Sequence, residues 1–265
     1  MAMIALFSQH RLAALGLVLS LLSVSDKSTR QFETIDIAVE DAAAPWSQPD
    51  GRGYANDVVR AAFDAVGINA QMHVMPYARC KALAVRGDYV ACVTMSPAPE
   101  LVKTIQFSKD PLFTYSCVFF ENPNKPVGKR IDDIPRGTVV ATVLGYEYPP
   151  EVLAHLAARG VVLEPAPTEE INLRKLASGR VALVIVNRDD VKSADRVAMQ
   201  AGVAAKIRPA FSYGSLPGYI GFSLANPRGR ALAQRFDRGM AKIIASGERE
   251  RIKKSWIARG ATSSK

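Results

Sequence analysis

The sequence is poor in the residues and motifs that mark several classes of protein. Its 265 residues include only three histidines and three cysteines, and the cysteine spacing fits no metal-binding motif. Lys and Arg outnumber Asp and Glu by 34 to 25, but no zinc-finger, RNA-binding or recognition-helix pattern accompanies them. We therefore predict no metal, no cofactor and no nucleic-acid partner, and we interpret the basic C-terminal segment as a solvated helix face.

The sequence also lacks a hydrophobic run of the ~20 residues that span a bilayer. Near the N-terminus, Leu12–Val24 carries no charge and follows Arg11, and this length is typical of a signal-peptide core. Ser23 and Ser25 supply small residues before a cleavage site, so we predict a cleaved signal peptide over residues 1–25. An uncleaved anchor or a buried helix is the alternative. Because no cysteine stands at the cleavage point, we expect a secreted protein without a lipid anchor.

The cysteines leave their pairing open. Cys80, Cys92 and Cys117 cannot all pair with one another, and an oxidising compartment permits one disulfide and one free thiol. The sequence does not say which two would pair. Since two of the three lie in apolar strand-like segments, we favour small buried hydrophobic residues as their role.

Alternating strand and helix patterns occur twice along the chain. The first series predicts strands and helices over Ile35–Val39, Asp57–Val66, Gln71–Met75, Tyr77–Arg86 and Tyr89–Met95. The second predicts them over Thr138–Val143, Pro149–Arg159, Val161–Leu163, Glu169–Ser178 and Val181–Val186. Each series favours a parallel sheet covered by helices, so we predict an α/β fold with two lobes.

The remaining segments predict how the lobes are joined. Strand-like stretches at Leu112–Phe120 and Gly218–Leu224 follow the two series, and an amphipathic helix over Arg230–Ile244 and a short last helix with Trp256 come after them. This helical tail has no sheet of its own, so it should pack back on the first lobe. The predicted divisions are 30–117 for the first part of lobe 1, 118–220 for lobe 2 and 221–262 for the rest of lobe 1. Two crossover strands then form a hinge, and a cleft between hinged lobes is a ligand site.

Five short segments carry a family resemblance through their order and spacing. They are Pro45-Trp46 with Asp50-Gly51, Gly53-Tyr54 through Asp57, Tyr77-Ala78-Arg79 with Gly87, Phe107-Ser108 through Pro111, and Leu176 through Val181. The mature chain resembles the family 3 extracellular solute-binding proteins, such as the polar amino-acid-binding components of ABC importers. The resemblance implies a type II periplasmic-binding-protein-like fold and a periplasmic monomer without enzyme activity. It would capture a small polar or amino-acid-like molecule and deliver it to an inner-membrane ABC permease.

The chain departs from this family where the ligand is clamped. The family's arginine for the α-carboxylate falls on Leu101 and its aspartate for the α-amino group on Asn187, whereas its acidic residue on the first strand is kept as Glu40. A lost charge-assisted hydrogen bond weakens binding by ~1.5–3 kcal/mol. We therefore expect weak or no binding of Glu, Asp and Gln, and a ligand with an apolar or aromatic part and a cationic group facing Glu40. If Arg79 or Arg188 pointed into the cleft, a carboxylate could bind again.

The predicted ligand contacts lie at strand ends, at helix starts and at family aromatic positions, where pockets of open α/β sheets form. They are Glu40, Trp46, Tyr77, Arg79, Thr94, Ser96, Gly145, Tyr146 and Asn187. For each of them a plain structural role is the alternative: core packing for the aromatic residues, an exposed helix position for Arg79 and a helix cap for the loop at Gly145.

Two further functions remain open at this stage. A similar fold serves periplasmic cyclohexadienyl dehydratases, and Glu40 or Glu147 would then be the carboxylic acid, although the loss of the arginine at Leu101 counts against carboxylate substrates. The other alternative is a sensory or accessory ligand-binding module that partners a receptor.

Overall fold

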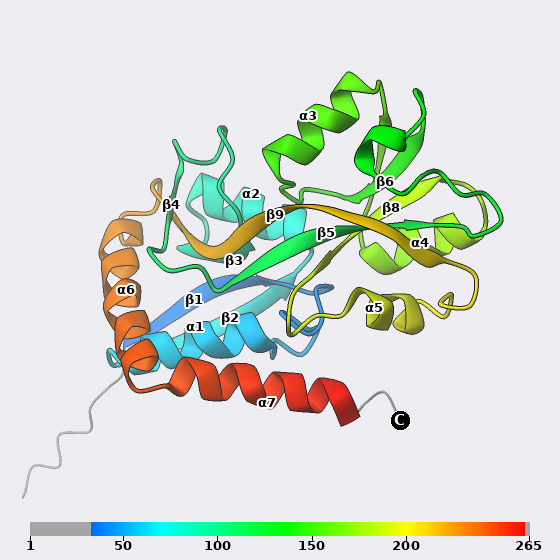
Figure 1. Ribbon diagram of the computed structural model, residues 1–265. Helices are drawn as coiled ribbons and strands as arrows, with labels where there is room; N and C mark the ends of the chain where they lie inside the picture. The colour runs from blue at the N-terminus through cyan, green and yellow to red at the C-terminus, as the bar shows by residue number, and fades with distance from the viewer. Residues whose placement is uncertain (1–32, 263–265) are drawn as a thin grey trace, which may run out of the picture. The chain divides into compact units, whose positions relative to one another are not determined.

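The structure is a computed structural model that describes residues 33–262 (Figure 1); the predicted signal peptide lies outside the described residues. The strands are β1 (Glu33–Glu40), β2 (Ile68–Met75), β3 (Ala91–Met95), β4 (Ile105–Phe107), β5 (Phe113–Glu121), β6 (Val139–Val143), β7 (Val162–Ala166), β8 (Leu183–Arg188) and β9 (Arg208–Ser223). The helices are α1 (Tyr54–Asp64), α2 (Tyr77–Arg86), the 3₁₀ turn η1 (Ile131–Asp133), α3 (Pro150–Ala158), α4 (Glu169–Ala177), α5 (Ala194–Gln200), α6 (Gly229–Ala245) and α7 (Glu248–Thr262).

Two groups of parallel strands are joined by an antiparallel pair. Within residues 33–262 the sheet order is β2-β1-β3-β9-β5-β8-β6-β7, with β4 paired to β9. β1 runs parallel to β2 and β3, and β6 runs parallel to β7 and β8. β5 and β9 lie side by side across the middle of the molecule (Figure 1). We call β1–β4 with α1, α2, α6 and α7 lobe 1, and β6–β8 with α3, α4 and α5 lobe 2.

The long strand β9 belongs to both halves of the sheet. Its residues 208–218 pair with β5, and residues 219–222 pair with β3. This arrangement confirms the two-lobed α/β class. Residues 33–262 pack as one compact unit, so the exact division at residues 117 and 220 stays a prediction.

The C-terminal helices pack on lobe 1. Gly239 of α6 lies so close to α1 that a Cβ atom there would stand 1.8 Å from the backbone oxygen of Ala62. Only a glycine permits this approach of the two helices. The buried face of α6, which includes Phe236 and Met240, joins the same apolar core as Phe63 of α1.

A disulfide ties α2 to β3. Cys80 and Cys92 are both fully buried and are bonded to each other, with 5.7 Å between their Cα atoms, whereas Cys117 remains a buried thiol. The sequence left the pairing open, and the structure shows that Cys80 pairs with Cys92; the burial of all three cysteines confirms that they are core residues. Apolar neighbours surround both Cys80 and Cys92, and the spacing alone did not reveal that α2 lies directly over β3.

Several elements differ from their predicted extent. β9 begins ten residues earlier than the predicted strand at Gly218, because pairing with β5 holds Pro209 and Pro217 in a strand that their missing N–H groups disfavour. The last helix, predicted as short, has 15 residues. The three-residue β4 and the seven-residue α5 are too short to give a periodic pattern.

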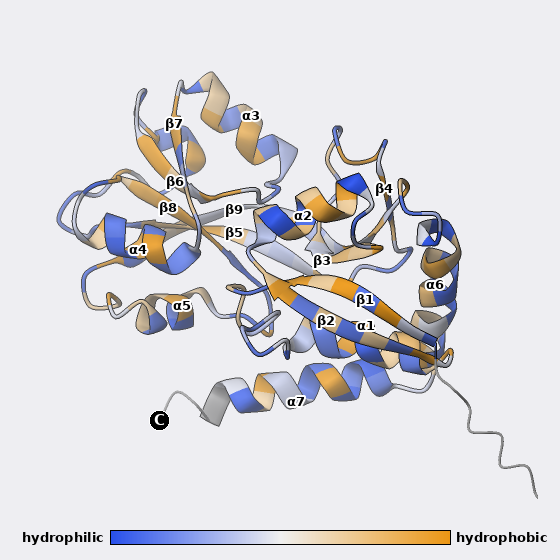
Figure 2. Ribbon diagram, turned by 180° about the vertical axis from the view of Figure 1, so that it is seen from behind, coloured by the Kyte–Doolittle hydropathy of each residue, from blue (hydrophilic) through white to orange (hydrophobic). Residues whose placement is uncertain are grey.

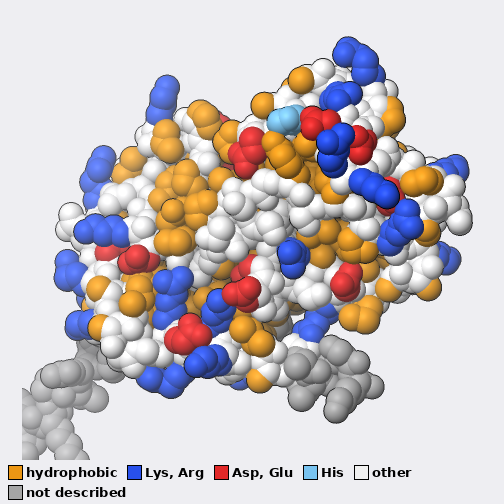
Figure 3. Space-filling model, viewed as in Figure 1, with side chains coloured by type: hydrophobic (Ala, Val, Ile, Leu, Met, Phe, Trp, Pro, Cys, Tyr) orange, Lys and Arg blue, Asp and Glu red, His pale blue; other side chains and the backbone are white. Residues whose placement is uncertain are grey.

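Hydrophobic residues concentrate in the strands, as Figure 2 shows for β1, β6 and β8. On the face seen in Figure 3, Lys and Arg side chains are scattered over both lobes and are interspersed with Asp and Glu. No described helix is both long enough and apolar enough to cross a bilayer.

Candidate functional site

A small cavity lies where the two lobes meet. Its volume is about 20 Å³, which is room for about one water molecule. The residues that line it are Glu40, Trp46, Tyr77, Thr94, Phe113, Tyr115, Tyr146, Glu147 and Asn187. The lobes are therefore closed on one another, and a ligand larger than a small group requires them to separate.

Lobe 1 contributes residues at the carboxyl ends of its strands, where ligands of open α/β sheets bind. Glu40 is the last residue of β1, and Tyr77 is the first residue of α2. Thr94, next to the end of β3, has a φ of 69°. This left-handed conformation is strained for a β-branched residue, and such strain clusters at functional sites.

Aromatic rings form most of the cavity wall. Trp46 stacks on Phe113 with 4.2 Å between ring centroids, and Tyr115 packs against both rings. Tyr146 of lobe 2 meets Tyr77 of lobe 1 edge to face at 5.1 Å. Such walls bind apolar or cationic groups through their faces.

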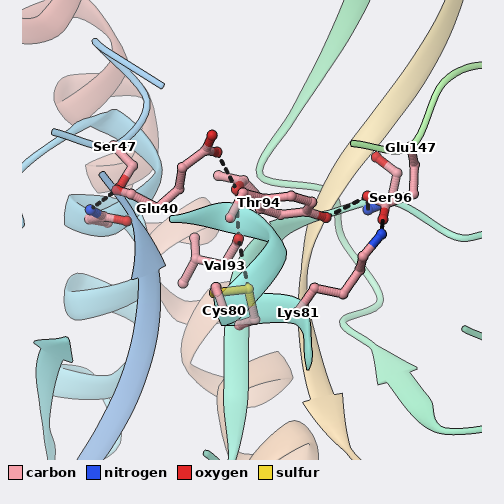
Figure 4. The surroundings of a disulfide bond; sticks show 11 residues. Glu40, Ser47, Cys80, Lys81, Val93, Thr94, Ser96 and Glu147 are labelled. Carbon is pink, nitrogen blue, oxygen red and sulfur yellow. Dashed lines mark hydrogen bonds and ion pairs between the residues drawn. A yellow bond between two sulfur atoms is a disulfide. The ribbon is translucent and has the colours of Figure 1, made fainter. Parts of the chain in front are cut away.

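Glu40 is the buried carboxyl of lobe 1. Its residue is 3% exposed, the Tyr146 hydroxyl donates a hydrogen bond to Oε1, and the Thr94 hydroxyl lies 3.5 Å from Oε2 (Figure 4). Burial raises the pKa of Glu40 to about 8, although the Tyr146 hydrogen bond and the ammonium of Lys192 act in the opposite direction. Glu40 is therefore mostly protonated in the closed site at neutral pH.

Glu147, from the loop before α3, is the second carboxylate. Its side chain is 5% exposed and forms an ion pair with Lys81 at 2.8 Å (Figure 4). The Tyr77 hydroxyl donates to Glu147 Oε2 at 2.5 Å, and the backbone N–H of Ser96 donates to the same oxygen at 3.2 Å. All three donors belong to lobe 1, so Glu147 bridges the two lobes.

A buried ion pair supports the lobe 2 wall. Lys192 Nζ lies 2.5 Å from Glu169 Oε2, with side chains 1% and 3% exposed, and the same ammonium lies 4.4 Å from the Trp46 ring centroid. The backbone N–H of Asn187 donates to Glu169 at 2.8 Å, and Asn187 Oδ1 accepts from the Cys117 thiol at 3.5 Å.

The charges around the cavity leave one carboxyl without a cation partner. Glu147 pairs with Lys81, and Glu169 pairs with Lys192. Among residues 33–262, no Lys, Arg or His nitrogen forms an ion pair with Glu40. Within the same residues, no group of three or more His, Cys, Asp or Glu side chains is placed to hold a metal ion.

The structure brings most of the predicted contacts together. Six of them line the cavity: Glu40, Trp46, Tyr77, Thr94, Tyr146 and Asn187. Ser96 lies at its edge through the hydrogen bond to Glu147, and Gly145 lines an adjacent groove of about 660 Å³ between the lobes.

Arg79 is the exception among the predicted contacts. Its side chain is exposed and does not line the cavity, because two positions along a helix turn it ~200° away from Tyr77. Leu101, at the family's arginine position, is 4% exposed in an apolar cluster with Met95 and Ile105. Neither position therefore supplies a cation to the cleft.

Sequence reasoning missed two aromatic residues and an ion pair. Phe113, Tyr115 and Cys117 alternate along β5, and this period of two could have indicated a shared face. Glu169 and Lys192 gave no comparable signal, because 23 residues separate them and Glu169 looked like an ordinary acidic residue at a helix start.

The family model for bacterial extracellular solute-binding proteins, family 3, matches residues 35–259. The chain belongs to this family. No curated protein sequence matches this solute-binding protein significantly.

Solved structures share the fold of this solute-binding protein at low sequence identity. A histidine kinase sensor domain similar to periplasmic binding proteins is 18% identical, with a TM-score of 0.71 over 84% of this chain and 95% of that one. An amino acid ABC transporter substrate-binding protein from Streptococcus pneumoniae, bound to L-arginine, is 16% identical, with a TM-score of 0.66 over 85% and 94%. An ancestral amino acid-binding protein, a precursor of cyclohexadienyl dehydratase, is 15% identical, with a TM-score of 0.67 over 84% and 95%.

Proposed function

We propose that this chain is a periplasmic solute-binding protein that captures an organic cation with an apolar or aromatic part and delivers it to an ABC permease. The observation that carries the proposal is the buried carboxyl of Glu40, which has no cation partner among residues 33–262 and faces a cavity walled by aromatic rings. A cationic group would pair with the ionised form of Glu40 and displace the proton that this carboxyl holds in the closed site, and the rings would contribute ~0.5–2 kcal/mol through cation–π contacts.

The absence of a carboxylate clamp supports the same choice of ligand. Leu101 is buried among apolar side chains, and Arg79 is exposed, so neither can pair with an α-carboxylate. Asn187 carries no charge, and its side-chain oxygen already accepts a hydrogen bond from the Cys117 thiol. The site thus offers a carboxyl to a cation and lacks the guanidinium that an amino acid requires.

Capture requires the lobes to move, because the closed cavity holds about one water. We propose that β5 and β9 form the hinge, with lobe 1 spanning residues 30–117 and 221–262 and lobe 2 spanning 118–220. We also propose a signal peptide at 1–25, a periplasmic location, a monomeric state and an ABC permease as partner. Membership of the extracellular family and the sequence pattern support these proposals.

Titration calorimetry tests the ligand class. Benzylamine, agmatine and tetramethylammonium serve as cationic probes without a carboxylate, and glutamate and glutamine represent ligands that a carboxylate clamp would bind. We expect binding among the cations only, and Glu40→Gln should weaken it about tenfold to a hundredfold, the loss of a hydrogen bond to a charged group. The matched control is Glu121→Gln, since Glu121 is an equally buried carboxyl that pairs with Arg208 within lobe 2 and away from the cavity. Submicromolar binding of glutamate or glutamine would refute the proposal.

An enzyme of the cyclohexadienyl dehydratase type is the second candidate. The raised pKa of Glu40, about 8, gives a buried protonated carboxyl at neutral pH, and such a group can act as a general acid. Incubation with prephenate and arogenate, followed by ultraviolet detection of the aromatic product, tests this. Turnover that is lost in Glu40→Gln would favour the enzyme over the binding protein.

A further inference from the structure

Glu147 has the surroundings of a bound ligand, although it is part of the chain. Its carboxylate accepts three hydrogen bonds. They come from the Lys81 ammonium at 2.8 Å, the Tyr77 hydroxyl at 2.5 Å and the Ser96 backbone N–H at 3.2 Å. A cation and two neutral donors converging on two oxygens form a carboxylate-binding site. The residues that carry these donors are largely buried: Ser96 is 1% exposed, Tyr77 is 4% exposed and the Lys81 side chain is 22% exposed.

The donors and the acceptor come from opposite sides of the cleft. Tyr77 and Lys81 lie in α2, and Ser96 follows β3, so all three belong to lobe 1. Glu147 lies in the lobe 2 loop between β6 and α3. The Tyr115 hydroxyl also stabilises this loop, because it donates a hydrogen bond to the backbone carbonyl of Glu147 at 2.9 Å. The loop therefore inserts a carboxylate into a donor set that the other lobe provides.

The donor set itself is rigidly built. The Cys80–Cys92 disulfide joins α2 to β3, so the elements that carry Tyr77, Lys81 and Ser96 are covalently linked beneath the site (Figure 4). These donors would keep their arrangement if Glu147 left. A site that survives without its occupant can accept another carboxylate.

We propose that Glu147 is a built-in carboxylate that occupies an anion site of lobe 1, holds the lobes closed without a ligand and excludes ligand carboxylates. Because it is attached to the same chain, its effective concentration at the site is in the millimolar range or higher, so a free carboxylate competes poorly. This role of Glu147 deepens the proposed function, because it gives a reason for the cleft to select against ligands with a carboxylate. The role rests on the proposed function in one respect, namely that the cleft is the ligand site.

Chemical rescue tests the proposal with acetate as the probe. Glu147→Ala removes the carboxylate and leaves the donors, so acetate should raise the melting temperature of this variant by about 2–4 °C relative to sodium chloride at equal ionic strength. Wild-type protein should show no such rise, because its site is filled. Adding Lys81→Met to Glu147→Ala should abolish the rescue, since the cation of the site is lost.

Small-angle X-ray scattering tests the closing role. Glu147→Ala and the isosteric Glu147→Gln should both increase the radius of gyration of the ligand-free protein. Acetate should not reverse the increase in Glu147→Ala, because free acetate fills the donor set of lobe 1 without a covalent link to lobe 2. Glu121→Gln is the matched control, because Glu121 likewise pairs with a cation, Arg208, and with a backbone N–H, at 2.8 Å each, but at the ends of β5 and β9 and not between the lobes. It should leave the radius of gyration unchanged.

Three outcomes would overturn the proposal. The first is a folded Glu147→Ala variant that acetate does not stabilise, and the second is a wild-type radius of gyration in both Glu147 variants. The third is an increase of equal size in Glu121→Gln. If Glu147→Ala fails to fold, the radius of gyration of Glu147→Gln alone tests whether Glu147 holds the lobes closed. These readouts involve no cationic ligand, so failure of the cation titrations with successful acetate rescue would reject the proposed function and keep the role of Glu147.

Discussion

Replacing Glu40 by glutamine should remove a pH dependence of stability that the folded structure creates. Burial holds the pKa of Glu40 at about 8, against an ordinary value of 4.5. Between these values the folded chain keeps the proton that the unfolded chain releases. The free energy of unfolding must therefore fall as the pH rises from about 4.5 to about 8, and it should level off above that. Glutamine cannot titrate and lacks this contribution.

The size of the effect follows from the separation of the two pKa values. At ~1.4 kcal/mol per pH unit, the wild type loses about 5 kcal/mol of this contribution across the window. Glu40→Gln should thus resemble the wild type near pH 5 and exceed its stability by several kcal/mol at pH 8. A cationic ligand needs the ionised carboxylate, so its affinity for the wild type should rise up to tenfold per pH unit until about pH 8.

Urea unfolding at pH 5, 6, 7 and 8 measures this directly. The control is Glu33→Gln, because the hydrogen bond from Arg235 lowers the pKa of Glu33. The stability from Glu33 is lost only as the pH falls below its ordinary value, so the control should keep the wild-type slope between pH 5 and 8. Parallel pH profiles for the wild type and Glu40→Gln would refute the reasoning.

Two stability predictions concern the covalent link and the buried ion pair. Cys80→Ser with Cys92→Ser should lower the free energy of unfolding by about 3 kcal/mol in denaturant titrations, the loop-closure value for a sequence separation near the observed 12 residues, and reductant should have no further effect on this variant. Lys192→Met should lower it by about 3–5 kcal/mol, because it leaves Glu169 buried without a cation. Lys175→Met, which breaks a pair with a half-exposed carboxylate, should cost about 1 kcal/mol or less; equal losses in both Lys variants would contradict the burial argument.

The sequence by itself determined the order of most strands and helices. Apolar spacing and glycine stops are local signals, and they mark α2 from Tyr77 to its left-handed cap at Gly87 and the buried strand β8. The spacing of the family motifs also placed Glu40, Trp46 and Tyr77 near one cleft, because strand ends and helix starts gather at one edge of a parallel sheet.

Only the tertiary structure decided how these residues act. The direction of Arg79 depends on the rotation of α2 against β1, and the pairing of Cys80 with Cys92 depends on which strand α2 covers. The contact between Glu147 and Lys81 joins residues that are 66 positions apart in the sequence, and no local sequence pattern can predict a contact over such a separation. Periodic patterns depend on residues that are neighbours in the sequence, so the sequence alone shows them. Burial, ion pairing and the pKa of Glu40 depend on groups that meet only when the two lobes close.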